Sequence, residues 1–486
     1  MSFTKSILLF SFLMMCCNAI SQTKKKPNVV YILTDQWRSS AFGYAGDPNV
    51  KTPHLDNFSK ESVNFRNAVS VSPVCTPHRA SLFTGRYPTS TGMFLNDLYL
   101  PSEELCMAEI FKAEGYNTGY LGKWHLDGHG REINVAPERR QGFDYWKGLE
   151  CSHDYNKMPY YDNNDPEKKY WNGYSSFALA DDANTYLESH AKDKKPFLLF
   201  ISIATPHFPH ETAPAKYQAM YPTESLKLQP NIPAEWEKKV REELQGYYGH
   251  CTATDEAIGK ILMKLKELQL DKNTIIVFTS DHGEMMGSHG HAPSAKQVAW
   301  DESIKVPFLI KYPTIGKNKG KVINAPINTP DILPSLLGLA DINIPKSIEG
   351  ENLAVLIKSP NPNTDRVALL MSIYPFATEF KYPEYRAIRT KQYSYIRTFN
   401  NTNMLFDTDK DPYQMENLFD KQGYEQLQKE MAAKLLLALK KAGDDFQPRE
   451  YYLKKWNLKP DPLKNAIDYW SFDAGKGIVQ TPKLNK

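Results

Sequence analysis

Residues 274–283 read TIIVFTSDHG, an apolar and largely β-branched run that ends in Asp281 and His282. Residues 28–36, NVVYILTDQ, repeat this arrangement, with Asp35 and a glutamine after the apolar run. Such runs are typical of strands buried on both faces of a parallel sheet. They are the strongest indication of the fold, and polar residues follow each of them.

Other segments extend the same alternation. Residues 118–121 and 196–204 (PFLLFISIA) read as further strands, and residues 182–191, 234–268 and 329–339 have helical patterns. Thr52 and Pro53 predict the start of a short helix, with threonine as its N-cap. The alternation predicts an α/β fold, in which helices cover both faces of a large, mostly parallel central sheet.

The pattern changes near residue 370. Residues 386–397, RAIRTKQYSYIR, alternate as a pair of antiparallel strands would, and a helix rich in Ala, Leu and Lys is expected over 424–441. We therefore predict an α/β domain over residues 23–370 and a smaller α+β subdomain over 371–486.

The first 22 residues are expected to be a signal peptide. Lys5 precedes an apolar run over 7–17, and Ala19 and Ser21 offer a cleavage site. The run is too short to span a membrane, and no later stretch is long enough. The protein is therefore expected in the periplasm or secreted. A lipid anchor through Cys16 is the less favoured alternative, because Met15 stands where lipoprotein signals want a small residue.

The charge balance limits the class of partner. The 486 residues include 59 Lys and Arg and 56 Asp and Glu, a net charge of +3. This balance excludes a general nucleic-acid binder that relies on counterion release.

Polar groups follow four separate predicted strands. They are Asp35-Gln36, Lys123-Trp124-His125, Thr205-Pro206-His207 and Asp281-His282. Since ligands bind at the carboxyl ends of strands in an open parallel sheet, these side chains are expected to meet at one edge. Two aspartates and an amide supply hard oxygen donors, which suit Ca²⁺ or Mg²⁺ better than zinc.

Residues 72–86, SPVCTPHRASLFTGR, contain the pattern C-x-P-x-R at Cys75, Pro77 and Arg79. Pro77 favours a first helical turn and Gly85 is placed to end the helix. Cys75 would then lie at a helix N-terminus, which favours an anion, with Arg79 one turn further along the same face.

At these motifs the sequence resembles the formylglycine-dependent sulfatases of the alkaline phosphatase superfamily, in particular the secreted polysaccharide sulfatases of Bacteroidota. The resemblance covers nearly the whole mature chain. The stretches that carry it are TDQWR at 34–38, CTPHRASLFTGRYP from Cys75, GYLGKWHLD at 119–127, TPHFPH at 205–210, SDHGEMMGSHG at 280–290 and DPYQMENL at 411–418.

The resemblance implies that a separate maturation enzyme oxidises Cys75 to formylglycine. One hydroxyl of the hydrated aldehyde would attack sulfur, and the other would later lose a proton and expel sulfate. The implied metal ligands, with Ca²⁺ expected and Mg²⁺ possible, are Asp35, Gln36, Cys75, Asp281 and His282. The implied catalytic residues are Cys75, Arg79, Lys123, His125, His207 and Lys296.

Within the family pattern, Arg79 matches the residue that steadies the hydrate. Lys123 and His207 match sulfate-binding groups, and His125 matches the base of the sulfate-expelling step. Lys296, in a looser local match, stands for the lysine near the leaving oxygen, which it or His207 could protonate.

Cys106, Cys151 and Cys251 are the other cysteines beyond residue 22, and none forms a C-x-x-C pair. Two disulfides would be ordinary in an exported protein. We do not expect two disulfides here, because Cys75 has a use of its own and the three remaining cysteines cannot all pair.

The stretch 145–174 is rich in Tyr and Trp among Asn, Asp and Pro, and it shows no clear period. We expect a long irregular insertion, either packed on its own aromatics or contacting substrate. The substrate-binding candidates are His153, Asp154 and Tyr155, with His129 and Arg131 placed to meet a uronate or a second sulfate. The predicted substrate is a sulfated polysaccharide or oligosaccharide, either algal such as ulvan or a glycosaminoglycan.

Two alternatives stay open from the sequence. One is a formylglycine-dependent phosphonate or phosphodiester hydrolase with the same core. The other is a non-catalytic glycan-binding protein in which Cys75 is unmodified. Asp255 and Glu256, within the helical pattern of 234–268, are expected on an exposed face.

Overall fold

The protein is described by a computed structural model covering residues 25–359, 364–375, 382–460, 472–473 and 477–478. The predicted signal peptide and Cys16 lie outside these residues. Among the residues described, no helix is both long and apolar enough to cross a bilayer.

A ten-stranded sheet forms the centre, in the order β11-β2-β10-β9-β1-β8-β4-β5-β6-β7. Its strands are β1 (Asn28–Asp35), β2 (Val63–Phe65), β4 (Asn117–Lys123), β5 (Tyr145–Leu149), β6 (Pro159–Asp162), β7 (Lys169–Tyr170), β8 (Phe197–Pro206), β9 (Thr274–Ser280), β10 (Phe308–Lys311) and β11 (Val322–Ile323). The five strands from β9 to β5 are mutually parallel. β10 runs antiparallel to β9, and β6 antiparallel to β5. The predicted mostly parallel sheet is confirmed.

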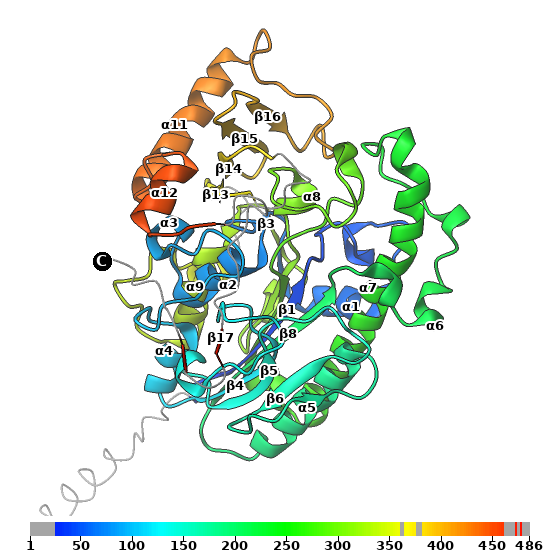
Figure 1. Cartoon of the computed structure of the whole chain (residues 1–486), viewed down its shortest axis with the longest axis vertical. Helices are drawn as coiled ribbons and strands as arrows, with labels where there is room; N and C mark the ends of the chain where they lie inside the picture. Colours follow the sequence, from blue (N-terminus) through cyan, green and yellow to red (C-terminus); the bar gives the residue numbers. More distant parts are fainter. Residues whose placement is uncertain (1–24, 360–363, 376–381, 461–471, 474–476, 479–486) are drawn as a thin grey trace, which may run out of the picture.

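Helices cover both faces of this sheet (Figure 1). On one side lie α1 (Pro53–Glu61), α5 (Ser175–His190) and α7 (Glu237–Glu267). On the other lie α2 (Cys75–Thr84), α4 (Met107–Ala113) and α9 (Thr329–Ala340). Alternate residues of β1 divide between the two sides: Val30 and Ile32 pack with the first group, Val29 and Tyr31 with the second. Shorter helices are α3 (Pro88–Thr91), α6 (Ala215–Gln218), α8 (Asp301–Ile304) and α10 (Ala354–Lys358).

A second, antiparallel sheet follows in the chain. It contains β13 (Ala368–Ser372), β14 (Tyr385–Arg389), β15 (Tyr393–Thr398) and β16 (Met404–Asp407), in that order. Helices α11 (Glu425–Lys441) and α12 (Arg449–Lys455) lie beside it (Figure 1). Two-stranded pairs are formed by β3 (Ala68–Val69) with β12 (Ile327–Asn328), and by β17 (Phe472–Asp473) with β18 (Gly477–Ile478). β13 begins just before the predicted boundary at residue 370, and the division into two domains stays a prediction.

The irregular insertion expected over 145–174 is wrong. Its first half forms β5 and β6, which extend the central sheet, and β7 pairs with β6. The aromatic residues hid the strand period because both faces of β5 are apolar: Trp146 packs in one core cluster and Tyr145 against the other. Part of the stretch packs on its own aromatics, as the stacking of Tyr160 on Trp171 shows.

The exposed position expected for Asp255 is also wrong. Its side chain is 1% exposed and accepts hydrogen bonds from the backbone N–H groups of His54 (3.0 Å) and Leu55 (2.8 Å). These N–H groups open α1, and the first turn of a helix leaves such donors without partners. Thr52, the expected cap, makes no capping bond. Asp255 therefore caps α1 from the middle of α7.

Candidate active site

The polar residues predicted at four strand ends do converge. Asp35 closes β1 and Lys123 closes β4, while His207 directly follows β8 and Asp281 directly follows β9. The strands β9, β1, β8 and β4 are consecutive neighbours in the sheet. Their carboxyl ends therefore bring the four side chains to one edge.

Cys75 faces this edge from the first position of α2. Val74 before it is extended, and Gly85 ends the helix with φ +66°, as the motif predicts. The Cys75 Sγ atom lies 3.3 Å from His282 Nε2 and 3.7 Å from Asp35 Oδ1. It lies 3.8 Å from the Nζ atoms of both Lys123 and Lys296.

Four of these side chains fit a divalent metal ion. Ligand atoms of Asp35, Cys75, Asp281 and His282 all lie within 4.8 Å of one another, and all four residues are buried. Two carboxylates this close would repel each other, which a cation between them relieves. The pKa of His282 is lowered, chiefly by burial. Its imidazole is therefore neutral, which is the form that binds a metal ion.

Gln36 lies beside this cluster with its amide already engaged. Its Oε1 accepts a hydrogen bond from Lys296 Nζ (2.9 Å), and its Nε2 donates to the Ser294 carbonyl (3.0 Å) and to the buried Glu284. Its backbone N–H donates to Asp281 Oδ1 (3.1 Å). In this arrangement Gln36 connects the loop that carries Lys296 to the edge of the sheet.

Two cations stabilise the charge of the aspartates. Arg79 lies 3.3 Å from Asp35 Oδ2 and 3.2 Å from Asp281 Oδ2, and Lys123 lies 2.6 Å from Asp35 Oδ2. Burial alone would raise the pKa of Asp35, but the charges of Lys123 and then Arg79 hold that pKa well below its usual value. Asp35 is therefore ionised although its side chain is completely buried.

His207 and Lys296 form a second pair. Lys296 Nζ donates to His207 Nε2 over 3.1 Å, and the Nδ1 side of the ring contacts the Phe208 carbonyl (2.8 Å) and the Tyr155 hydroxyl (3.4 Å). Burial and then the charge of Lys296 keep the pKa of His207 well below its usual value. The imidazole is therefore neutral, and its Nε2 accepts the hydrogen bond from Lys296.

His125 follows β4 by two residues and has φ +59°. Its Nε2 lies 2.8 Å from Asp97 Oδ1, and its carbonyl accepts a hydrogen bond from Thr76 Oγ1 (3.0 Å). A histidine paired with a carboxylate is a common arrangement for proton transfer.

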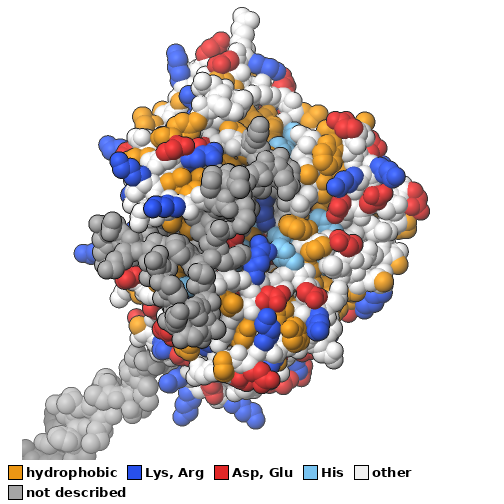
Figure 2. Space-filling view, viewed as in Figure 1, with side chains coloured by type: hydrophobic (Ala, Val, Ile, Leu, Met, Phe, Trp, Pro, Cys, Tyr) orange, Lys and Arg blue, Asp and Glu red, His pale blue; other side chains and the backbone are white. Residues whose placement is uncertain are grey.

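Cys75, both lysines, His125 and His207 line one cavity of about 330 Å³. Its lining residues are Cys75, Asn96, Lys123, His125, Arg131, Cys151, His153, His207, Phe208, Ser294, Ala295, Lys296 and Gln297. Figure 2 shows histidine side chains beside Lys or Arg side chains near the centre of the face viewed. A cavity with this many cationic and histidine groups suits an anion.

The substrate-binding candidates divide. Arg131 and His153 line the cavity, and the ring of His153 stacks on His207 at 4.7 Å between centroids. Burial, and then Lys123 and Arg131, lower the pKa of His153 to about 3.

The other three candidates do not line the cavity. His129 is buried, with Nδ1 3.1 Å from Asp127 Oδ2. Asp154 is exposed outside it, and Tyr155 is buried behind His207, where its hydroxyl also donates to the Phe208 carbonyl (2.8 Å).

Several residues of the site were missed. Asn96 lines the cavity and accepts from the Thr76 N–H (3.0 Å), while Asp97, with φ +63°, holds His125. No local pattern marks either residue. Glu150 and Cys151 directly follow β5, so the rule used for the other strands would have found them had β5 been recognised.

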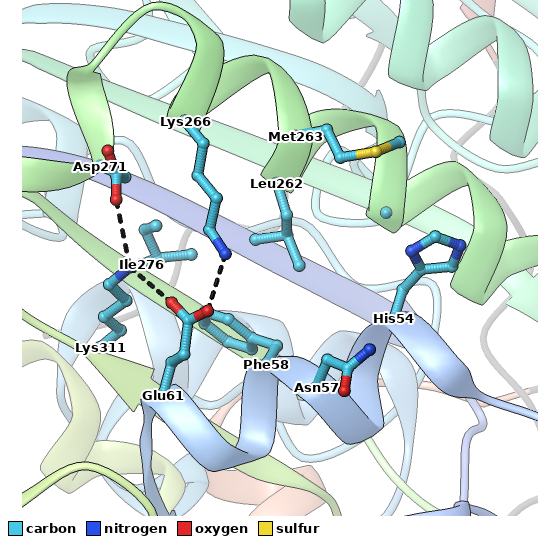
Figure 3. Close-up of a pocket in the computed structure, with 11 residues that line it drawn as sticks. His54, Asn57, Phe58, Glu61, Leu262, Met263, Lys266, Asp271, Ile276 and Lys311 are labelled. Carbon is cyan, nitrogen blue, oxygen red and sulfur yellow. Dashed lines mark hydrogen bonds and ion pairs between the residues drawn. The ribbon is translucent and has the colours of Figure 1, made fainter.

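A separate hollow of about 190 Å³ lies between α1 and α7 (Figure 3). Glu61 there forms ion pairs with Lys266 (2.7 Å) and Lys311 (3.0 Å), and Asp271 forms one with Lys311 (3.3 Å). Its four charged side chains neutralise one another, and it contains none of the predicted site residues. All four cysteines among the described residues are free, and two disulfides are not formed, as expected.

Comparison with known proteins agrees with this geometry. The family model described as Sulfatase matches residues 27–342, which is more than half of the chain. The chain belongs to the sulfatase family. This sulfatase is therefore a sulfuric ester hydrolase, and its family implies a formylglycine nucleophile and a divalent metal ion. A second family model, described as N-sulphoglucosamine sulphohydrolase, C-terminal, matches residues 287–441.

Individual relatives support the same conclusion. The sulfatase is 64% identical to an ulvan-active sulfatase of Formosa agariphila over 98% of this chain and 94% of the relative. It is 30% identical to an endo-4-O-sulfatase of Bacteroides thetaiotaomicron, over 86% and 93% of the two chains. The crystal structure of a putative sulfatase from Bacteroides fragilis superposes with a TM-score of 0.79 at 30% identity, over 89% of this chain and 98% of that one.

Proposed function

We propose that this sulfatase removes sulfate esters from a sulfated algal polysaccharide of the ulvan type, or from its oligosaccharides. The observation that carries the proposal is the position of Cys75, within 4 Å of two lysines and two metal-binding side chains at the base of a cationic cavity. The 64% identity to an ulvan-active sulfatase supports the choice of polymer.

Cys75 is proposed to carry the nucleophile after a maturation enzyme converts it to formylglycine. Its Sγ atom stands in for the hydroxyl oxygens of the hydrated aldehyde. The hydrated aldehyde would supply the attacking hydroxyl. A bound Ca²⁺ would be held by Asp35, Asp281, His282 and position 75, and would supply positive charge. Mg²⁺ is the other candidate ion. Gln36 was expected as a ligand, and we propose that it positions Lys296 from beside the ion.

The remaining residues act on charge and protons. Arg79, which contacts both aspartates, is proposed to steady the hydrate and the metal site. Lys123, 3.8 Å from Cys75 Sγ, is proposed to bind a sulfate oxygen. Negative charge grows on the departing oxygen as the ester breaks, and fixed cations in a buried site stabilise it. Lys296 and His207, which share a hydrogen bond, are proposed to protonate that oxygen. His125, paired with Asp97, is proposed to take the proton that allows sulfate to leave.

The sugar is proposed to bind at the outer part of the cavity. Lys123 and Lys296 are 1% and 7% exposed, whereas Arg131 is exposed where it lines the same cavity. A sulfate drawn to the buried lysines would leave the rest of the sugar near Arg131 and His153. We propose that Arg131 meets a second anionic group, a uronate carboxylate or another sulfate.

The setting follows from the predicted leader. Export to the periplasm or the medium is proposed, where long sulfated polymers or their fragments are met. Maturation of Cys75 would come before the active site is complete.

A panel of substrates tests the proposal. Metal-loaded enzyme with formylglycine at position 75 would be offered sulfated ulvan oligosaccharides, sulfated glycosaminoglycan oligosaccharides, aryl sulfates and phosphonate monoesters. We expect the highest kcat/KM on ulvan oligosaccharides. Activity confined to aryl sulfates would contradict the polysaccharide substrate. A higher kcat/KM on phosphonate monoesters than on every sulfate ester would contradict the proposal that sulfate esters are the substrate.

A further inference from the structure

Glu150 carries a buried carboxyl group close to the site but outside the cavity. It directly follows β5 and its side chain is fully buried. No Lys or Arg pairs with it among the ion pairs of the described residues. Burying a carboxylate without a cation is costly unless hydrogen bonds compensate, so its partners explain why it is there.

Its partners are the backbone N–H groups that follow His125. Glu150 Oε1 accepts from Asp127 N (2.9 Å) and Gly128 N (3.0 Å), and Oε2 accepts from Leu126 N (3.2 Å). Its own carbonyl accepts from the His125 N–H (2.9 Å). Four consecutive N–H groups from His125 onward are thus held by this one residue.

This part of the chain needs such support. His125 has φ +59° and Gly128 has φ +65°, and a side chain at 128 would meet the Tyr99 N–H at 2.9 Å. A left-handed conformation costs free energy for a residue such as histidine, and it persists only where the surroundings enforce it. Burial and then the nearby Asp127 raise the pKa of Glu150 to about 8, while the N–H donors oppose that rise.

The same turn fixes the position of the His125 ring. Thr76, the residue after Cys75, donates to the His125 carbonyl (3.0 Å) and accepts from the Asp97 N–H (3.3 Å). Asp97 in turn holds His125 Nε2. The His125 ring is therefore connected through Asp97 to Thr76 of α2. The backbone that follows His125 is held by Glu150.

We propose that Glu150 is the positioning residue that holds His125 in place for proton transfer. The inference rests on the proposed role of His125 as a base. Glu150 touches neither substrate nor reacting atoms, and it acts only through the turn. Its loss should slow the chemical step and leave substrate binding to the lysines unchanged.

The experiment compares Glu150→Gln and Glu150→Ala with the wild-type enzyme on an aryl sulfate, after formylglycine content is equalised. Gln keeps one acceptor oxygen and should retain part of the activity that Ala loses. Since small misplacements of catalytic groups are costly, kcat should fall about 10- to 100-fold in Glu150→Gln. KM should fall with it and kcat/KM should change much less, because only the second step, in which sulfate leaves, is slowed.

Asp255→Asn is the matched control. Asp255 is equally buried and also accepts backbone N–H groups, but it caps α1 away from the cavity. It should lower the melting temperature as much as Glu150→Gln does, with wild-type kcat. An equal loss of kcat in both variants would show a merely structural effect and overturn the inference.

A double-mutant cycle with His125→Ala completes the test. If Glu150 acts through His125, the Glu150→Gln penalty should nearly vanish in the His125→Ala background. If Glu150→Gln lowers kcat by the same factor in the His125→Ala background, the inference is overturned. It is also overturned if Glu150→Gln keeps wild-type kcat while His125→Ala is impaired. Neither result would contradict the proposed role of His125. Wild-type kcat in His125→Ala would contradict the proposed base itself, and the inference with it.

Discussion

Lys296 donates a hydrogen bond to Nε2 of His207 over 3.1 Å, and the same ammonium group lies 3.8 Å from Sγ of Cys75. The two side chains come from different strands and loops, so their pairing is a tertiary feature. It places a hydrogen-bond donor beside the side chain proposed to carry the nucleophile.

This pairing predicts a dependence on the leaving alcohol. Lys296→Ala and His207→Ala should each lower kcat on sugar sulfates by about 100-fold or more, because a poor leaving group needs a proton. The loss should be much smaller on an aryl sulfate with an acidic phenol. Lys266→Ala, in the separate hollow of Figure 3, is the control for a removed lysine. Equal losses on both substrates would contradict proton donation.

The buried carboxylates predict a metal requirement. Removing divalent ions with a chelator should abolish sulfate release and lower the melting temperature, since an ion that binds only the folded state stabilises it. Asp281→Asn should lower kcat/KM by at least about 100-fold, as expected when a bound cation is lost. Adding back Ca²⁺ should restore activity better than Mg²⁺ does. Full activity in the chelated enzyme would rule out the proposed metal site.

Arg131 predicts selectivity for acidic substrates. Arg131→Ala should raise KM roughly tenfold on oligosaccharides that carry a uronate or a second sulfate, about the value of one charge-assisted contact. Aryl sulfates, which have no second anionic group, should be hydrolysed as before. The measurement is a comparison of KM on a native oligosaccharide and on its carboxyl-reduced form. An unchanged KM on both would exclude Arg131 from substrate binding.

Asp255 predicts a dependence of stability on pH. Burial raises its pKa from 3.8 to about 7, so the folded state binds the proton more tightly than the unfolded state. Its contribution is therefore complete below about pH 4 and is lost as pH rises through 7, by at most about 1.4 kcal/mol per pH unit. Asp255→Asn cannot ionise. Wild type should lose stability relative to this variant between pH 5 and pH 8 in urea unfolding, and a constant difference would contradict the shift.

Much of the fold and site could be predicted because the signals are local. Each apolar strand ends in a polar residue, and parallel strands carry those ends to the same edge, so Asp35, Lys123, His207 and Asp281 were found without tertiary information. Cys75 was found because its helix begins and ends on residues with strong local preferences.

The contacts that could not be predicted depend on distant parts of the chain. The Gln36 amide is engaged by Lys296 and Glu284, which lie far along the sequence. Asp255 looks like any charged residue of a helix until α1 packs beside it. Glu150 lay in a stretch whose aromatic residues hid a strand. In each case a partner outside the local window decides the role.

The most direct test of the account is sulfate release from an ulvan oligosaccharide by enzyme whose residue 75 has been shown by mass spectrometry to be formylglycine. We expect release of inorganic sulfate in proportion to the formylglycine content, and none from Cys75→Ala produced with the same maturation enzyme. Fully converted, Ca²⁺-loaded enzyme that releases no sulfate, or a Cys75→Ala variant as active as wild type, would contradict it.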